Sequence, residues 1–111
     1  MKTIEDGNKI IANFMIRQKP QKHFCVLSRD KEGYDVFVSD ETLYYPINKL
    51  KFHSSFNWLI PVCDKIVAIG INELRVSVEF ENAKDDSNID RLWCAVVEFI
   101  EWYNKQTSVK P

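Results

Sequence analysis

The densest group of side chains able to do chemistry is the segment His53, Ser54 and Ser55, with Asp64 further along. A histidine and hydroxyls before a helix could hold an anion, because the free N–H groups at a helix N-terminus attract negative charge. A histidine touching a cysteine could also form a nucleophilic pair, which would make this region an enzyme site. Helix capping by a serine explains the same residues with no chemistry. Since no catalytic signature accompanies them, we expect a cap and no enzyme activity.

The cysteines and histidines form no recognisable ligand set. Cys25, Cys63 and Cys94 are odd in number, widely spaced and flanked by apolar residues, which predicts buried, unreactive thiols rather than a disulfide framework. A metal site needs ligands at short spacing, such as cysteine pairs two residues apart. We therefore expect no metal and no cofactor. The N-terminus lacks a signal-peptide pattern, and no apolar run reaches the roughly 18 residues of a membrane span, so we expect a cytoplasmic location and no membrane partner.

A basic segment over residues 17–31 is the basis of an alternative function. Its cations are Arg17, Lys19, Lys22, Arg29 and Lys31. With one acid, Asp30, and Phe24 interleaved, this segment could follow a phosphate backbone locally, although the net charge of -1 excludes binding of nucleic acid by bulk charge. An acidic cluster over residues 79–90 has the opposite charge, which also allows head-to-tail self-association.

Aromatic residues make up 13% of the chain and include three tryptophans. Trp58 and Trp93 lie on apolar helix faces and are predicted to be core residues. Other aromatic residues are less tied to one face, and such residues are enriched at protein interfaces. Our interface candidates are Trp102, Tyr44, Tyr45 and Phe99. We expect them to bind a partner protein or a second copy in a homodimer, because closed symmetric dimers are the commonest assemblies.

Three segments have the three-and-four apolar spacing of helices. They cover residues 3–16, 54–69 and 88–105. Thr3 is the expected cap of the first helix. Gly7 weakens that helix by about 1 kcal/mol relative to Ala, so its place on the apolar face indicates that another element packs closely there. Pro61 requires that the second helix begin near Asn57 or bend in its first turn.

Short aromatic and β-branched runs predict strands at 24–27, 34–38 and 42–47, and strict alternation predicts a fourth at 73–81. Pro46 marks the third of these as an edge strand or as one that ends at Tyr45. The order α-β-β-β-α-β-α predicts an α+β fold with three to four mainly antiparallel strands and three helices packed on one face. At 111 residues, the chain is one domain over residues 1–111.

Four blocks of the sequence carry a family resemblance. They are residues 8–15, 51–66, 73–81 and 95–104. They resemble a family of short uncharacterised proteins from phages, prophages and Bacteroidetes-type genomes, with a histidine-x-serine-tryptophan-aspartate-x-leucine-methionine-proline-valine segment and a C-terminal phenylalanine-isoleucine-x-tryptophan-tyrosine-asparagine. This chain has Phe56 and Asn57 in place of the tryptophan and aspartate, and Val67 where a glutamate is common. The resemblance implies a phage or mobile-element origin with no known activity, and we expect a small accessory protein that acts by binding.

Overall fold

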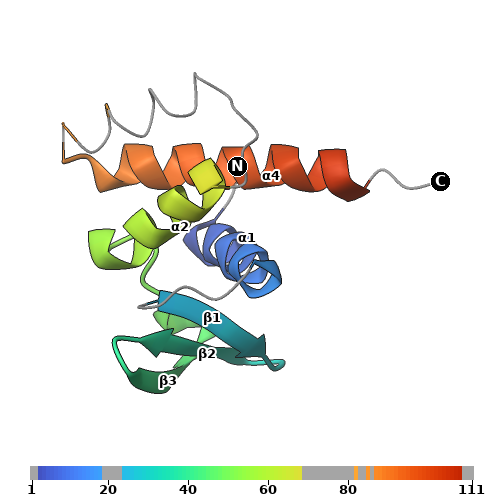
Figure 1. The fold of residues 1–111 in the computed structure, drawn as a ribbon, viewed down its shortest axis with the longest axis vertical. Coiled ribbons are helices and arrows are strands. Elements are labelled where there is room, and N and C mark those ends of the chain that lie inside the picture. The colour runs from blue at the N-terminus through green and yellow to red at the C-terminus, as the bar shows by residue number, and fades with distance from the viewer. Residues whose placement is uncertain (1–2, 19–23, 69–81, 83–84, 86, 109–111) are drawn as a thin grey trace.

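The computed structural model of the chain describes residues 3–18, 24–68, 82, 85 and 87–108. In this part of the chain, helices lie on one face of a three-stranded antiparallel sheet of order β1-β2-β3 (Figure 1). The elements are α1 (Ile4–Arg17), β1 (Phe24–Arg29), β2 (Gly33–Val38), β3 (Glu41–Pro46), the 3-10 helix η1 (Ile47–Lys49), α2 (Phe56–Ala68) and α4 (Ile89–Ser108). The predicted α+β class is confirmed, while the predicted strand 73–81 lies outside the described residues.

Polar side chains define where α1 and α4 begin. The hydroxyl of Thr3 accepts a hydrogen bond from the N–H of Asp6 at 3.0 Å, which confirms the predicted cap. The side-chain oxygen of Asn88 accepts from the N–H of Arg91 at 3.1 Å at the start of α4. Both helices also carry acids in their first turns, where the helix dipole favours negative charge.

α2 begins at Phe56, adjacent to Asn57, so the predicted alternative of a start near Asn57 is confirmed. The carbonyl of Ser55 accepts hydrogen bonds from the N–H groups of Trp58 and Leu59, both at 3.1 Å, and starts the helix. Pro61 lies inside the helix and removes one bond, the one that its N–H would have made to the carbonyl of Asn57. Asn57 is exposed, so the loss falls on the solvent side of α2.

The strands β2 and β3 are joined by a two-residue turn at Ser39 and Asp40, whose φ angles are 48° and 75°. Positive φ at both central residues is the signature of the type I′ turn, which suits the twist of a hairpin. Between β1 and β2, the register shifts at Leu27, a β-bulge that leaves this side chain 47% exposed. The tight turn therefore sets the register between β2 and β3, whereas the bulge shifts the register between β1 and β2.

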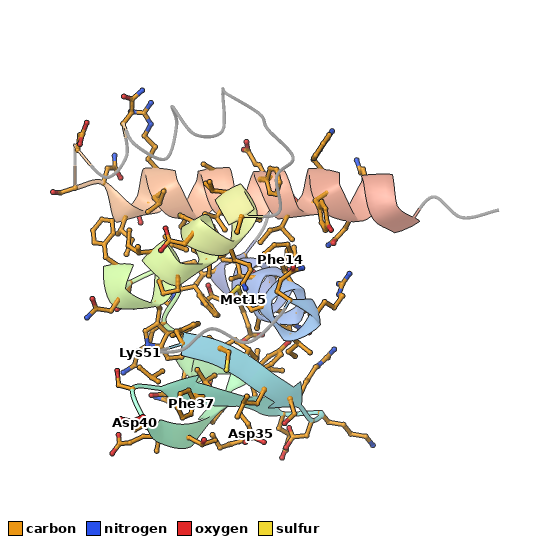
Figure 2. The ribbon with its side chains drawn as sticks, viewed as in Figure 1. Phe14, Met15, Asp35, Phe37, Asp40 and Lys51 are labelled. Carbon is orange, nitrogen blue, oxygen red and sulfur yellow. The ribbon has the colours of Figure 1, made fainter. Side chains whose placement is uncertain are left out.

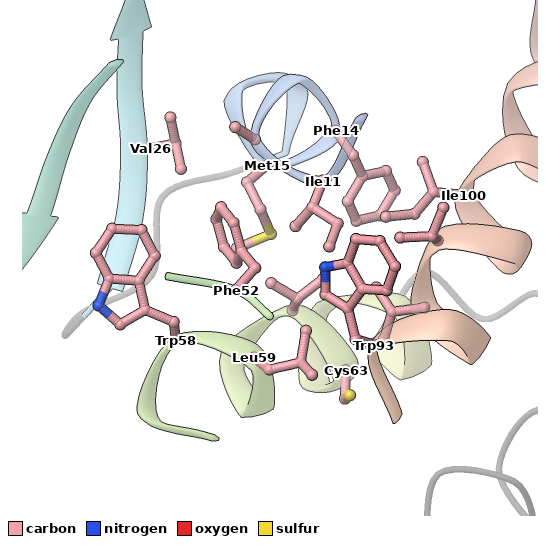
Figure 3. Close-up of a cluster of buried hydrophobic side chains, with 14 of the residues drawn as sticks. Ile11, Phe14, Met15, Val26, Phe52, Trp58, Leu59, Cys63, Trp93 and Ile100 are labelled. Atoms are coloured by element: carbon pink, nitrogen blue, oxygen red, sulfur yellow. The ribbon is translucent and has the colours of Figure 1, made fainter. Parts of the chain in front are cut away.

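The core is one cluster of buried side chains that runs from the sheet, past α1 and α2, to α4 (Figure 3). Towards the sheet, the Trp58 ring meets the Phe24 ring at 5.6 Å and the Phe52 ring at 5.1 Å, both edge to face. Towards α4, Ile11 and Phe14 of α1 pack with Trp93 and Ile100. Trp58 and Trp93 are 6% and 9% exposed, as their helical spacing predicts. The layers are thus the sheet, then α1 with α2, then α4 (Figure 1).

Alternation along β2 separates the two faces of the sheet. Tyr34 and Val36 are fully buried under the helices. Asp35 and Phe37 lie on the opposite face, away from α1 (Figure 2). The hydroxyl of Tyr34 donates to the side-chain oxygen of Asn13 at 3.1 Å and so joins β2 to α1. Among the described helices, none is both long and apolar enough to cross a bilayer.

Candidate functional site

His53, the centre of the most chemically dense segment, is joined to Asn8 of α1. Its Nδ1 lies 2.9 Å from Nδ2 of Asn8, an amide that is 2% exposed. The same Nδ2 donates to the carbonyl of Leu50 at 3.3 Å, and Oδ1 of Asn8 accepts from the indole Nε1–H of Trp93 at 2.9 Å. Because an indole can only donate, the amide oxygen faces Trp93 and the amide NH₂ faces the other two.

This orientation of Asn8 determines which ring nitrogen of His53 accepts a hydrogen bond. An NH₂ group can only donate, so Nδ1 of His53 is the acceptor and the ring hydrogen sits on Nε2. The buried amide thereby ties together α1, the loop before α2 and α4, with all its hydrogen-bonding groups used. A satisfied buried network of this kind holds one arrangement of elements. His53 therefore positions its loop through this contact with Asn8.

The two serines of the segment serve the start of α2 through their backbone. The N–H groups of Ser54 and Ser55 both donate to the carbonyl of Lys51, at 3.0 and 2.9 Å. Asp64 is exposed on α2 and Cys63 is buried, and the contact described for His53 is with Asn8. In the described part of the chain, no three His, Cys, Asp or Glu side chains come together as metal ligands.

Gly7 is the reason that α4 can lie so close to α1. A Cβ atom on Gly7 would overlap Cζ2 of Trp93 and lie 2.5 Å from Cη2 of the same ring. The prediction that another element packs closely at Gly7 is therefore confirmed, and the element is α4. The absence of a side chain at residue 7 lets the indole reach the neighbouring Asn8.

A second polar cluster fixes Tyr44 on the sheet. Oδ1 of Asp30 accepts from the hydroxyl of Tyr44 at 2.7 Å and from the N–H groups of Glu32 and Gly33 at 2.7 and 2.8 Å. The hydrogen bond from Tyr44 is the main cause that lowers the pKa of Asp30, and the same bond raises the pKa of Tyr44 to about 12. Tyr44, which is 45% exposed, is thus an aromatic ring with a fixed hydroxyl.

The four interface candidates have different environments. Trp102 on α4 is 39% exposed, and its ring lies 5.8 Å from that of Phe99. Phe99 itself is 5% exposed and stacks on Tyr103 at 6.1 Å, so its expected place at an interface is wrong: its ring belongs to the core. Tyr45 is half-buried against Trp58, with the rings 4.8 Å apart. Trp102 and Tyr44 remain as the exposed aromatic candidates.

Other large apolar side chains are also exposed in the described residues. They are Ile4, Leu27, Leu43 and Val67. Leu43 stands next to Tyr44 on β3 and is 49% exposed, so two adjacent positions of this strand carry exposed apolar surface. Leu43 is not among the predicted interface residues. Its place on a strand that Pro46 marks as an edge strand is the signal that could have identified it.

The basic segment is divided among separate elements. Arg17 is exposed at the end of α1 and Lys31 is exposed in the turn after β1. The guanidinium of Arg29 stands 5.9 Å from the centre of the Tyr34 ring, a cation–π contact that occupies this side chain. Lys19 and Lys22 lie outside the described residues. The alternative of local nucleic-acid binding therefore stays a prediction.

The cysteines divide into two buried thiols and one exposed thiol. Cys25 and Cys63 are buried as predicted, but Cys94 is exposed, so the expectation for this residue is wrong. Partial burial is the main cause that raises the pKa of the Cys94 thiol, and the carboxylates of Glu98 and Asp90, one turn away on either side, raise it further. A thiol with a raised pKa is mostly protonated near neutral pH and is a weak nucleophile.

No family model, no curated protein and no solved structure matches this chain. The resemblance through four sequence blocks therefore stays a prediction.

Proposed function

We propose that this chain is a small accessory protein of the phage or mobile-element type that acts by binding protein, without catalysis of its own. The observation that carries the proposal is the exposed ring of Trp102 on a rigid aromatic base. Trp102 rests on Phe99, Phe99 stacks on Tyr103, and Tyr103 meets Phe14 of α1 edge to face at 5.9 Å. The exposed ring is thus the outer end of a series of rings that begins in the core.

A supported aromatic ring suits binding for an energetic reason. Ordering a mobile side chain at an interface costs about 0.5–1.5 kcal/mol, and a ring already held by neighbours avoids most of this cost. Tryptophan is among the residues that most often dominate binding energy, with losses of 2 kcal/mol or more on truncation. A loss of about 2 kcal/mol corresponds to roughly a 30-fold weaker complex.

The groups that could do chemistry have structural uses or weak reactivity, which also supports binding. Nδ1 of His53 is the acceptor for Asn8, and the Cys94 thiol has a raised pKa. Tyr44 donates its hydroxyl hydrogen to Asp30. Each of these side chains either stabilises the fold or stays protonated. The exposed aromatic surface is therefore the feature that we assign to binding a partner.

The test compares three tagged forms of the chain expressed in cells of its source organism: wild type, Trp102→Ser and Val67→Ser. Val67 is 58% exposed on α2 and serves as the matched control. We expect one protein to co-purify in near-equal amount with wild type and with Val67→Ser, and to be lost with Trp102→Ser. Thermal unfolding should show that both variants are folded.

Two results would contradict the proposal. One is the absence of any protein that co-purifies in near-equal amount with the wild-type chain. The other is a partner that Trp102→Ser retains as well as Val67→Ser does, since the exposed ring would then contribute nothing to binding.

A further inference from the structure

The outer edge of β3 is the surface from which we draw a further inference. Within the described residues, β3 pairs with β2 and with no other strand. Exposed apolar side chains, Leu43 and Tyr44, occupy the middle of this strand. An edge strand with a free row of N–H and C=O groups is a template for another strand.

The register shows which peptide groups point outward. Val38 and Glu41, which flank the two-residue turn, form a hydrogen-bonded pair, so the N–H and C=O groups of Glu41 point towards β2. Along β3, residues whose peptide groups point towards β2 then alternate with residues whose peptide groups point away from it. The N–H of Ile47 donates to the carbonyl of Glu32 at 2.9 Å, which agrees with odd-numbered residues facing β2. The N–H and C=O groups of Thr42 and Tyr44 therefore face away from β2.

We propose that a second copy of this chain pairs with β3 in antiparallel fashion, about a two-fold axis at Leu43. The inference rests on the proposed function, protein binding, and names a second copy as one partner. Thr42 of each copy then faces Tyr44 of the other copy, and the two pairs exchange four N–H···O=C bonds. Leu43 faces Leu43 of the second copy as a non-hydrogen-bonded pair, the kind in which side chains approach most closely.

Other registers use the edge less well. An axis at Tyr44 places Thr42 opposite Pro46 of the second copy, and proline has no N–H to donate. An axis at Thr42 pairs Tyr44 with Asp40, which lies in the turn with φ at 75°. Of these three axes, only the one at Leu43 pairs Thr42 and Tyr44, the outward-facing residues of β3 that have an N–H, with the same two residues of the second copy.

Charge complementarity argues that the occupant is a second copy. In this register, Glu41 stands opposite Tyr45 of the second copy, on the same face of the sheet as Leu43. Nζ of Lys51 stands 5.7 Å from the centre of the Tyr45 ring, so this lysine accompanies Tyr45. In the proposed dimer, Glu41 of one copy therefore lies on the side of Tyr45 and Lys51 of the other copy, and the two-fold axis repeats this pair of opposite charges.

The first experiment is sedimentation velocity of the purified full chain over a range of micromolar concentrations. Leu43→Lys places two like charges at the axis, and Thr42→Pro removes an outward N–H while leaving the bonds to β2 in place. Leu27→Lys is the control, because Leu27 is exposed to a similar extent, 47%, on β1. We expect wild type and Leu27→Lys to dimerise, and the dissociation constant to rise at least about tenfold in Leu43→Lys and Thr42→Pro.

The second experiment tests the register. In a Cys94→Ser background, Leu43→Cys should form a disulfide-linked dimer under mild oxidation faster than Leu27→Cys, because the two Leu43 positions face each other across the axis. The inference is overturned if wild type sediments as a monomer at every concentration, or if Leu43→Lys dimerises as well as Leu27→Lys. Neither result affects the Trp102-dependent capture of another protein, so the two proposals fail separately.

Discussion

Replacing Gly7 with alanine should destabilise this protein, although alanine is the better helix former. In an open helix, the exchange would raise stability by about 1 kcal/mol. Here the added methyl group overlaps the indole of Trp93. That ring cannot move aside freely, because its N–H is bonded to Asn8 and the ring is 9% exposed.

The expected size follows from two opposing effects. Overpacking of a core typically costs about 1–3 kcal/mol, and the overlap with a held ring places Gly7→Ala at the upper end. Subtracting the gain of about 1 kcal/mol in helix propensity leaves a net loss near 2 kcal/mol. For a domain of this size, the melting temperature should fall by roughly 8 °C.

Trp93→Phe supplies the matched background, because phenylalanine lacks the outer ring that the new methyl group would overlap. There Gly7→Ala should be neutral or stabilising by up to about 1 kcal/mol. Urea unfolding of the four forms, followed by circular dichroism so that loss of a tryptophan does not alter the signal, gives the coupling. The reasoning is refuted if Gly7→Ala stabilises the wild-type protein, or if its effect is the same in both backgrounds.

The remaining predictions concern the two polar clusters and the exposed thiol. Asn8→Ala should lower the free energy of unfolding by about 3 kcal/mol in urea, since its buried partners lose their hydrogen bonds, and a loss below about 1 kcal/mol would show that the network is dispensable. In the native protein, Cys94 should be the thiol that a maleimide labels, slowly and faster with rising pH because its pKa is raised; rapid labelling near neutral pH would contradict this. The Tyr44 phenol should titrate near pH 12 by absorbance and closer to its ordinary value of 10.0 in Asp30→Asn, so its contribution to stability is full below pH 10 and lost as pH rises towards 12. An unchanged titration in Asp30→Asn would remove Asp30 as the cause.

Local sequence patterns were sufficient to predict most of the elements and much of the core. Apolar residues three and four apart mark α1, α2 and α4, because a helix returns to the same face at that interval. Gly7 on an apolar stripe predicted close packing, and the structure places α4 there. These features depend on residues near one another in the chain, which is why a single sequence contains them.

Features that depend on distant residues were missed or misjudged. Asn8 and Trp93 are 85 positions apart, and no local pattern pairs them. Asn8 does lie on the apolar stripe between Ile4 and Ile11, and a polar residue at such a position is the available signal of a buried hydrogen-bond network. Cys94 has apolar sequence neighbours, but each residue of a helix is turned about 100° from the next, so buried neighbours do not imply a buried thiol.

Phe99 was misjudged because the width of an apolar arc does not reveal how many neighbours cover it. α4 packs against both α1 and α2, which covers a wider arc than one neighbour would. Phe99 is buried, and among the described side chains of α4 Trp102 is the large apolar one that is exposed. A wide apolar arc on a helix therefore predicts either a second neighbour within the fold or an interface. In α4, Phe99 is buried in the core, whereas Trp102, three residues later, is exposed.

The layered arrangement makes the two proposed contact surfaces independent. Trp102 is on α4 and Leu43 is on β3, and α1 and α2 lie between these elements (Figure 1). Pairing along β3 therefore extends the sheet while leaving α4 of each copy accessible, so a dimer would present two Trp102 rings to partner proteins. It follows that Trp102→Ser should leave the dimer dissociation constant unchanged, and Leu43→Lys should leave one Trp102-dependent site on each monomer. If either substitution abolished both kinds of binding, the two side chains would have to act through one surface, contrary to their separation by the helical layer.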